Sequence, residues 1–127
     1  MAGNEILFNC SYILSETDDK GMITFVSDSF CQVAGYTQIE LIGKPHNIVR
    51  HPDMPKIAFK GLWDDLRHKG FWRGIVKNLA KNGDYYWVDA MALRKIDYHG
   101  KVTFASVRTS ATRAQIEWAD ALYKTLR

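Results

Sequence analysis

The chain has 127 residues, which fits one domain and leaves no room for two of ordinary size. Hydrophobic residues make up 46% and charged residues 24%, the balance of a folded globular protein rather than a disordered one. The net charge of +3 is mild, and no dense Lys/Arg cluster with interleaved aromatics occurs, so nothing favours a nucleic-acid partner. No apolar run approaches the roughly 18 residues of a spanning helix, so we expect no direct membrane insertion by this segment.

Targeting and cysteine signals are sparse. The first residues lack the basic and apolar regions of a secretory signal. Cys10 and Cys31 form neither a disulfide framework nor a CxxC metal motif. These features favour a reducing, cytoplasmic setting.

The first half of the chain predicts a hairpin followed by two short helices. Residues 12–16 and 23–26 predict strands joined by a turn at 18–21. A helix is expected from Ser27 or Asp28 to Gly35. Thr37 to Glu40 has the pattern of a capping box that opens a second helix. Residues 1–11 receive no assignment, and we expect the domain proper to span 12–110.

A proline-rich stretch at residues 44–55 divides the chain. It holds all three prolines and two of the four histidines, together with Arg50 and Asp53. Prolines fix the backbone, so this loop is expected to be rigid. Two interpretations remain open from the residues: a stiff surface crossover, or one wall of a pocket for an anionic cofactor.

The second half predicts a long helix and three strands. A helix is expected over 53–68, capped by Asp53, with Trp63 on its apolar side. From Phe71 the period becomes two, so Trp72 and Asn78 share one face of a strand. Asn-Gly at 82–83 predicts a hairpin into a strand over 85–95, and 102–108 predicts the last strand. Trp87 is left open between ligand contact and packing on the opposite face.

The last segment, 111–127, predicts an amphipathic helix. Thr112 to Gln115 forms a second capping box, and the helix carries an apolar stripe of Ile116, Ala119, Tyr123 and Leu126. This helix either docks on the domain or leads to a downstream transducing region. The predicted fold is α+β: a five-stranded antiparallel sheet with short helices on one face and a C-terminal helix. Such a layout can enclose a cavity of roughly 300 Å³ or more.

Several motifs resemble PAS sensor domains, and more specifically the PAS domain of bacterial aerotaxis receptors. The generic PAS pattern lies in residues 21–26 and 30–36. The more specific match is the Arg-His-Pro-Asp-Met-Pro element at 50–55. Further matches are Trp63 and the segments 45–49, 72–78, 81–88 and 122–126.

This resemblance implies a PAS fold that binds FAD non-covalently and senses redox state or oxygen-linked electron flow. It implies a downstream HAMP or other signalling region as partner, in the cytoplasmic part of a membrane-associated receptor. By matching motif, it implies that FAD binding needs Arg50, His51 and Asp53. It also implies that Trp63 lies against the flavin, that Trp72 lines the pocket mouth and that Asn78 hydrogen-bonds the polar edge of the ring. The acidic side chain of Asp53 suits a role in capping the helix or orienting Arg50 better than contact with phosphate. Asn78 offers both the donor and the acceptor that the flavin edge needs.

Two alternatives remain from the sequence. A haem-binding gas sensor would use His46, His51 or His68 as iron ligand. A ligand-free module would dimerise through the terminal helix. Photo-adduct chemistry is disfavoured because residues 46–51 contain no cysteine. No glycine-rich phosphate loop, HExxH or GxSxG occurs, so an enzyme is not expected.

Overall fold

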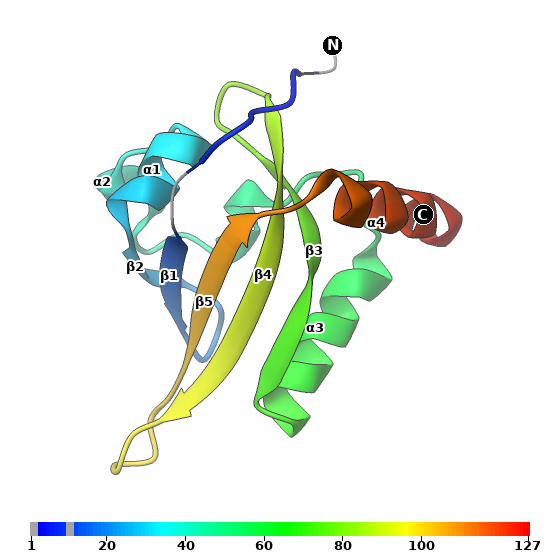
Figure 1. The fold of residues 1–127 in the computed structure, drawn as a ribbon. Helices are drawn as coiled ribbons and strands as arrows, with labels where there is room; N and C mark the ends of the chain where they lie inside the picture. Colours follow the sequence, from blue (N-terminus) through cyan, green and yellow to red (C-terminus); the bar gives the residue numbers. More distant parts are fainter. Residues whose placement is uncertain (1–2, 10–11) are drawn as a thin grey trace.

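One antiparallel sheet organises the protein, with its strands in the order β2-β1-β5-β4-β3 (Figure 1). The computed structural model describes residues 3–9 and 12–127. The strands are β1 (Ile13–Asp18), β2 (Ile23–Val26), β3 (Phe71–Leu79), β4 (Tyr85–Ile96) and β5 (Val102–Ser110). The helices are α1 (Asp28–Ala34), α2 (Gln38–Leu41), the 3-10 helix η1 (His46–Val49), α3 (Lys56–His68) and α4 (Arg113–Leu126). The predicted α+β fold, with its five antiparallel strands, is confirmed.

The predicted turns and caps depend on short polar side chains. In the first hairpin, the Asp18 carboxylate accepts from the amides of Lys20 and Met22, and Gly21 has a φ of +84° that suits glycine. Ser27 caps α1 by accepting from the Phe30 amide. The capping boxes that begin at Thr37 and Thr112 are both present.

One predicted cap is wrong. Helix α3 begins at Lys56, after Pro55, and no side chain caps it. The Asp53 carboxylate instead accepts a 2.8 Å hydrogen bond from the Lys77 ammonium of β3. A fully charged donor in a half-buried position outcompetes a helix end for this carboxylate.

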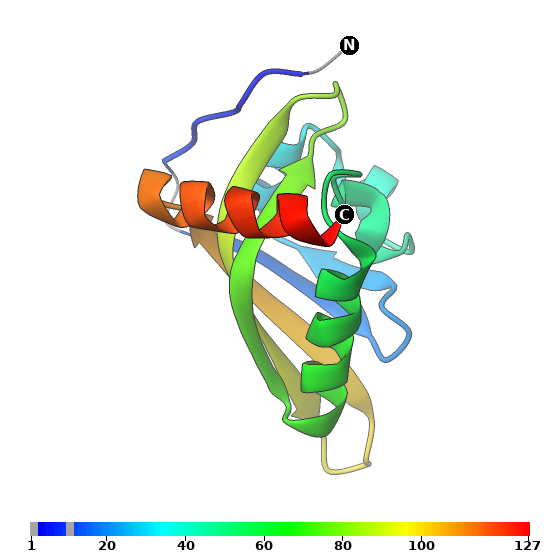
Figure 2. The same cartoon turned by 90° about the vertical axis from the view of Figure 1, so that its right-hand side faces the viewer.

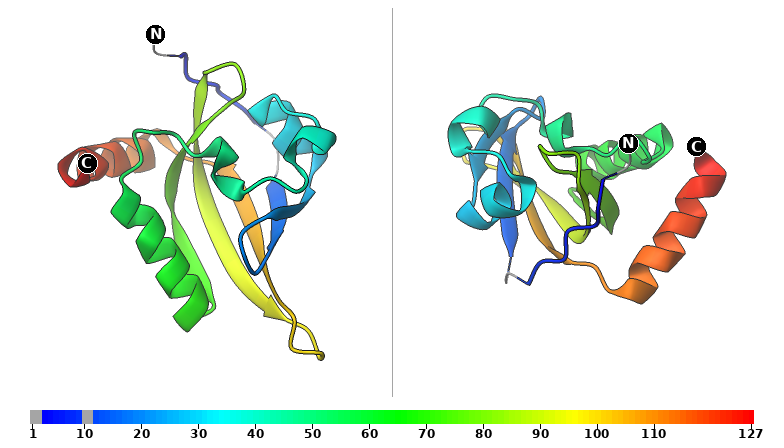
Figure 3. Two further views of the ribbon diagram at one scale, coloured as in Figure 1. Left: turned by 180° about the vertical axis from the view of Figure 1, so that it is seen from behind. Right: turned by 90° about the horizontal axis from the view of Figure 1, so that it is seen from above.

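The two faces of the sheet carry different layers. Helices α1, α2, η1 and α3 lie on one face, whereas α4 crosses the other (Figures 2 and 3). The Tyr123 hydroxyl of α4 donates to the Ile75 carbonyl at 2.6 Å, and Gln115 donates to Asp89. Ile116, Ala119 and Tyr123 are buried, and Leu126 is half exposed. The terminal helix therefore docks on the domain, on the side opposite the short helices.

Trp87 belongs to the face that α4 covers. It is buried, and it lines a small hollow with Phe8 and Ile116. The N-terminal segment closes this side, because the Ile6 amide donates to the Tyr85 carbonyl at 2.7 Å and Glu5 pairs with Arg113. Trp87 is thus a packing residue. Cys10 lies outside the described residues.

Two hydrophobic clusters fill the interior of the described chain. The larger joins β-strand residues such as Ile13, Val76 and Val88 to α1 and α4. The smaller lies between α3 and the sheet, around Leu66, Ala92 and Phe104. No helix in the described parts of the chain is long and apolar enough to cross a membrane.

Candidate functional site

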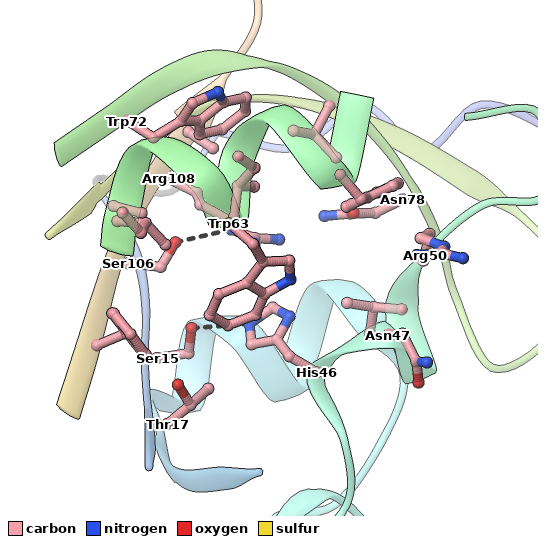
Figure 4. A pocket seen from close by; sticks show the side chains of 18 of the residues that line it. Ser15, Thr17, His46, Asn47, Arg50, Trp63, Trp72, Asn78, Ser106 and Arg108 are labelled. Carbon is pink, nitrogen blue, oxygen red and sulfur yellow. Dashed lines mark hydrogen bonds between the residues drawn. The ribbon is translucent and has the colours of Figure 1, made fainter. Parts of the chain in front are cut away.

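A pocket lies between the sheet, η1 and α3 (Figure 4). About 100 Å³ of it is available to the centres of water molecules, and its empty space, open mouth included, is about 750 Å³. The structure has a cavity on this face, as expected, but its water-accessible volume is below the roughly 300 Å³ of typical ligand sites. The lining residues used below are Ser15, His46, Arg50, Trp63, Trp72, Asn78, Ala90, Ala92, Ser106 and Arg108.

Small side chains make the floor of the pocket. Ser15 pairs with Ser106, Ser106 with Ala92, and Ala92 with Trp72, so one row crosses four strands. Four neighbouring strands thus contribute two hydroxymethyl groups, one methyl group and one indole ring to the same face. Such a floor leaves room for a flat ligand, and the indole borders that space at β3.

Gly74 explains how Trp72 lies against the sheet. The two residues share a face of β3, and a Cβ added at Gly74 would lie 2.4 Å from Cζ2 of the Trp72 ring. The indole therefore occupies the space that any other residue at position 74 would fill. The sequence pattern placed Gly74 on this face but did not indicate this contact.

The polar end of the pocket is built around Arg108. Its guanidinium is buried, and it donates from Nε to the Ser106 hydroxyl at 2.9 Å. It also donates from Nη1 to the Asn78 side-chain oxygen at 2.9 Å, and the Asn78 amide nitrogen donates to the Val49 carbonyl at 3.3 Å. The Asn78 amide is assigned in the orientation that satisfies both contacts. Burial lowers the pKa of Arg108, but a guanidinium remains protonated in proteins.

Tyr86 lies beside this cluster and is buried. Burial raises the pKa of its phenol to about 12, against a smaller opposing effect from Arg108. The phenol is therefore neutral at physiological pH and offers no negative charge to balance the guanidinium.

His46 forms the other polar wall. Its Nε2 lies 3.0 Å from the Ser15 hydroxyl, and its ring packs edge-on against Phe30. Burial, followed by the charge of Arg108, lowers the pKa of His46 to about 3. The imidazole is therefore neutral, and the buried charge at this end of the pocket comes from Arg108.

Arg50 and Trp63 stand nearer the mouth. The Arg50 guanidinium lies 4.4 Å from the centre of the Phe59 ring, a cation–π contact. The side chain of Trp63 projects from α3 into the pocket and packs edge-on against Phe104 (Figure 4). Both side chains can therefore meet a ligand that enters between η1 and α3.

The charge of the lining is one-sided. Arg50 and Arg108 line the pocket, and among residues 3–9 and 12–127 no aspartate or glutamate does so. The described part of the chain also holds no group of three potential metal-ligating side chains. The site suits a ligand with anionic or electron-rich groups.

The structure brings together four of the six residues expected to bind the cofactor. Arg50, Trp63, Trp72 and Asn78 line the pocket. His51 and Asp53 do not line it. The His51 Nδ1 instead accepts from the Asp53 amide at 2.9 Å, and its ring packs edge-on against Tyr85. The expectation that Asp53 orients Arg50 is also not met, because Asp53 pairs with Lys77 and Arg127.

Sequence reasoning missed Arg108, Ser106 and Ser15 as pocket residues. A signal existed in the last strand, where Phe104, Ser106 and Arg108 alternate on one face. Polar residues at inward-facing positions of a strand indicate a polar site. Of the three histidines considered for iron, only His46 lines the pocket, while the exposed His68 contacts the Asp64 carbonyl of its own helix.

Comparison with known proteins agrees with this fold and pocket. A family model described as a PAS fold matches residues 23–107, and the chain belongs to that family. Among PAS proteins, it is 48% identical to the aerotaxis receptor of Escherichia coli K12 over 124 residues. This match covers 97% of the chain but only 24% of the receptor. The resemblance to aerotaxis receptors that the motifs indicated is confirmed.

A more distant relative and two solved structures are also similar to this chain. The chain is 29% identical to the nitrogen fixation regulatory protein of Klebsiella pneumoniae over 62% of its length and 16% of that protein. A PAS domain from Colwellia psychrerythraea superimposes with a TM-score of 0.72 at 20% identity, over 80% of this chain and 87% of that one. A light-oxygen-voltage domain studied with a flavin analogue superimposes with a TM-score of 0.74 at 19% identity, over 89% of this chain and 84% of that one. At these identities the structures show the fold alone.

Proposed function

We propose that this chain is a sensory domain that binds FAD non-covalently and reports redox state or oxygen-linked electron flow. The observation that carries the proposal is the pocket, which combines a flat floor of small residues with two guanidinium groups and no carboxylate. The 48% identity to an aerotaxis receptor supports the choice of cofactor and signal. The match to a receptor also supports a downstream signalling region as partner. The family resemblance of the motifs adds the proposal that this partner is a HAMP region in a cytoplasmic setting.

The residues present fit a flavin. An asparagine side chain offers both donors and acceptors, and Asn78 presents them at the polar end of the pocket beside Val49, Tyr86 and Arg108. The polar edge of a ring system can exchange hydrogen bonds with these groups. Arg50 stands at the mouth, where a guanidinium can bind a pyrophosphate.

The pocket can adapt to the ligand through a lining side chain that moves when the ligand enters. Trp63 is the candidate, since it projects into the pocket from α3 and is only partly buried. We expect Trp63 to border the bound ring and its fluorescence to be quenched on binding.

The buried side chains of Arg108 and Asn78 suggest how a change in the charge of the ligand would alter the protein. FAD, when bound, supplies reversible electron transfer. Arg108 would stabilise added negative charge at the polar edge of the pocket. Asn78 would then exchange hydrogen bonds between Arg108, Val49 and the ligand. Because Asn78 is in β3, and the Ile75 carbonyl of β3 accepts from Tyr123, this exchange would shift how α4 docks.

Release of the cofactor tests the proposal. The purified chain is denatured, and the released chromophore is separated by chromatography against FAD, FMN and haem standards. We expect FAD in near-stoichiometric amount from the wild type. Release of another flavin would correct the cofactor, and release of nothing would contradict the proposal and favour a ligand-free dimerisation module.

A haem sensor is the second candidate, and His46 is the observation that favours it. Its neutral ring lies in the pocket, and neutral imidazole is the form that binds iron. An observation against haem is that Nε2 of His46 already forms a hydrogen bond with the Ser15 hydroxyl, so this nitrogen is not free to bind iron. Cys31 is not among the lining residues, which gives no support to flavin adduct chemistry. We propose no catalytic role for the chain.

A further inference from the structure

The loop between η1 and α3 wraps around the free edge of the sheet. Strand β3 is the last in the sheet order, so one of its edges has no neighbouring strand within the described part of the chain. Arg50 forms an isolated antiparallel bridge with Asn78, and the His51 amide donates to the Lys77 carbonyl at 3.4 Å. The Met54 sulfur also accepts from the Lys77 amide at 3.5 Å. The loop backbone is thereby fixed to β3 at the two residues 77 and 78.

The loop and the part of β3 that it contacts place side chains on opposite faces of the sheet. Asn78 and Arg50 line the pocket, whereas Lys77 points to the other face because side chains alternate along a strand. There the Lys77 ammonium lies 4.5 Å from the centre of the Tyr85 ring and binds Asp53. The loop therefore begins in the pocket and, three residues later, contacts the layer that holds α4.

A series of ion pairs continues from Lys77 to the end of α4. The Lys77 side chain is 13% exposed, and its Nζ lies 2.8 Å from Oδ2 of Asp53. Oδ1 of Asp53 lies 3.8 Å from Nη1 of Arg127, and Nη2 of Arg127 lies 3.6 Å from Oδ1 of Asp120. The hydrogen bond from Lys77 lowers the pKa of Asp53, so this carboxylate is ionised at neutral pH.

We propose that the ion-pair series Lys77–Asp53–Arg127–Asp120 is a latch that couples the pocket wall to the C-terminal end of α4. Asp53 is a positioning residue in this arrangement and does not touch the ligand. A shift of Arg50 or Asn78 moves the loop on β3 and changes the distance from Asp53 to Arg127. The signalling role of the latch rests on the proposed function, whereas the latch itself does not.

The geometry defines the strength of each link. The Lys77–Asp53 link is short, and its Lys77 end is mostly shielded from solvent, so it is less sensitive to salt than a fully exposed pair. The links through Arg127 are longer and about one-third exposed, so they are weak and sensitive to salt. The latch is therefore expected to open at Arg127 and to stay attached to the pocket wall through the Lys77–Asp53 pair.

Hydrogen–deuterium exchange on the chain tests the latch, with cofactor content measured on the same samples. Asp53→Asn removes the pairs with Lys77 and Arg127, whereas Arg127→Gln removes the pairs with Asp53 and Asp120, at an exposed helix end where folding is not at risk. Asp65→Asn is the matched control, because Asp65 is similarly exposed and pairs only within α3, with Lys69. We expect about two- to fivefold faster exchange in the last two turns of α4 for the first two variants, and none for the control.

The outcomes separate the latch from the proposed function. Faster exchange at α4 in both variants, with wild-type cofactor content, supports the latch. Loss of cofactor in Asp53→Asn with unchanged exchange at α4 would overturn it, because Asp53 would then serve the ligand site. Unchanged exchange in both variants would also overturn it. Faster exchange in a chain that binds no flavin would support the latch and contradict the proposed function.

Discussion

Substitution of Gly74 by alanine tests whether Trp72 borders the ligand. The added Cβ would lie 2.4 Å from Cζ2 and 2.5 Å from Cη2 of the Trp72 ring. Carbon atoms in contact are about 3.5–4.0 Å apart, so the indole must move by about 1 Å or more. The backbone imposes no further strain, since Gly74 is not among the glycines with positive φ.

The magnitude follows from the cost of overpacking. Forcing an extra methyl group into a packed site costs about 1–3 kcal/mol. If the displaced indole leaves the position that receives the ring, a similar free energy is lost from binding. Each 1.4 kcal/mol is a factor of ten, so FAD affinity is expected to fall by about 5- to 150-fold.

The assay is titration of the apoprotein with FAD, followed by flavin or tryptophan fluorescence, beside a thermal melt without ligand. Gly61→Ala is the matched control, because a Cβ there meets no atom within 4 Å and Gly61 lies inside α3, another wall of the pocket. This control is expected to stabilise the protein by about 0.5–1 kcal/mol and to leave affinity unchanged. A Gly74→Ala protein with a lower melting temperature but wild-type affinity would refute the placement of Trp72 beside the ligand.

Three further predictions concern the polar end of the pocket and the terminal helix. Asn78→Ala removes the acceptor for Arg108, and we expect weaker FAD binding or loss of redox-dependent exchange at α4; retention of both would refute the role of Asn78. His46 has a lowered pKa in the folded state, so its contribution to stability is present above pH 6.5 and declines as pH falls. The decline should be about 1.4 kcal/mol per pH unit toward pH 3, and His46→Gln should flatten it in urea unfolding at several pH values. Tyr123→Phe leaves the Ile75 carbonyl without its donor, and should cost about 0.5–1.5 kcal/mol in a denaturant titration without lowering FAD affinity.

The fold was largely predictable because its local signals agree with one another. The capping boxes at Thr37 and Thr112 and the turns at Gly21 and Gly83 depend on residues close in sequence. The alternation that begins at Phe71 placed Trp72 and Asn78 on one face, as the structure has them. Strand ends were less predictable: β1 runs to Asp18 and β5 to Ser110, beyond the predicted limits, because pairing with neighbouring strands extends them.

The site was predictable only in part, since its geometry depends on contacts between distant segments. Arg50 and Asp53 are three residues apart, yet their side chains lie on opposite faces of the sheet, because the loop crosses the edge of β3. No local sequence pattern reveals that separation. Arg108 was missed because a single arginine in a strand is usually exposed. Its guanidinium is held by Ser106 of the same strand and by Asn78, which lies beside it only when β3, β4 and β5 assemble.

The absorbance spectrum of the purified chain, before and after dithionite, tests the central claim most directly. A bound flavin predicts bands near about 370 and 450 nm and loss of the 450 nm band on reduction. Return of the band on exposure to air would show that the pocket holds a reversible redox group. A colourless protein, or a Soret band near about 400 nm, would contradict the account.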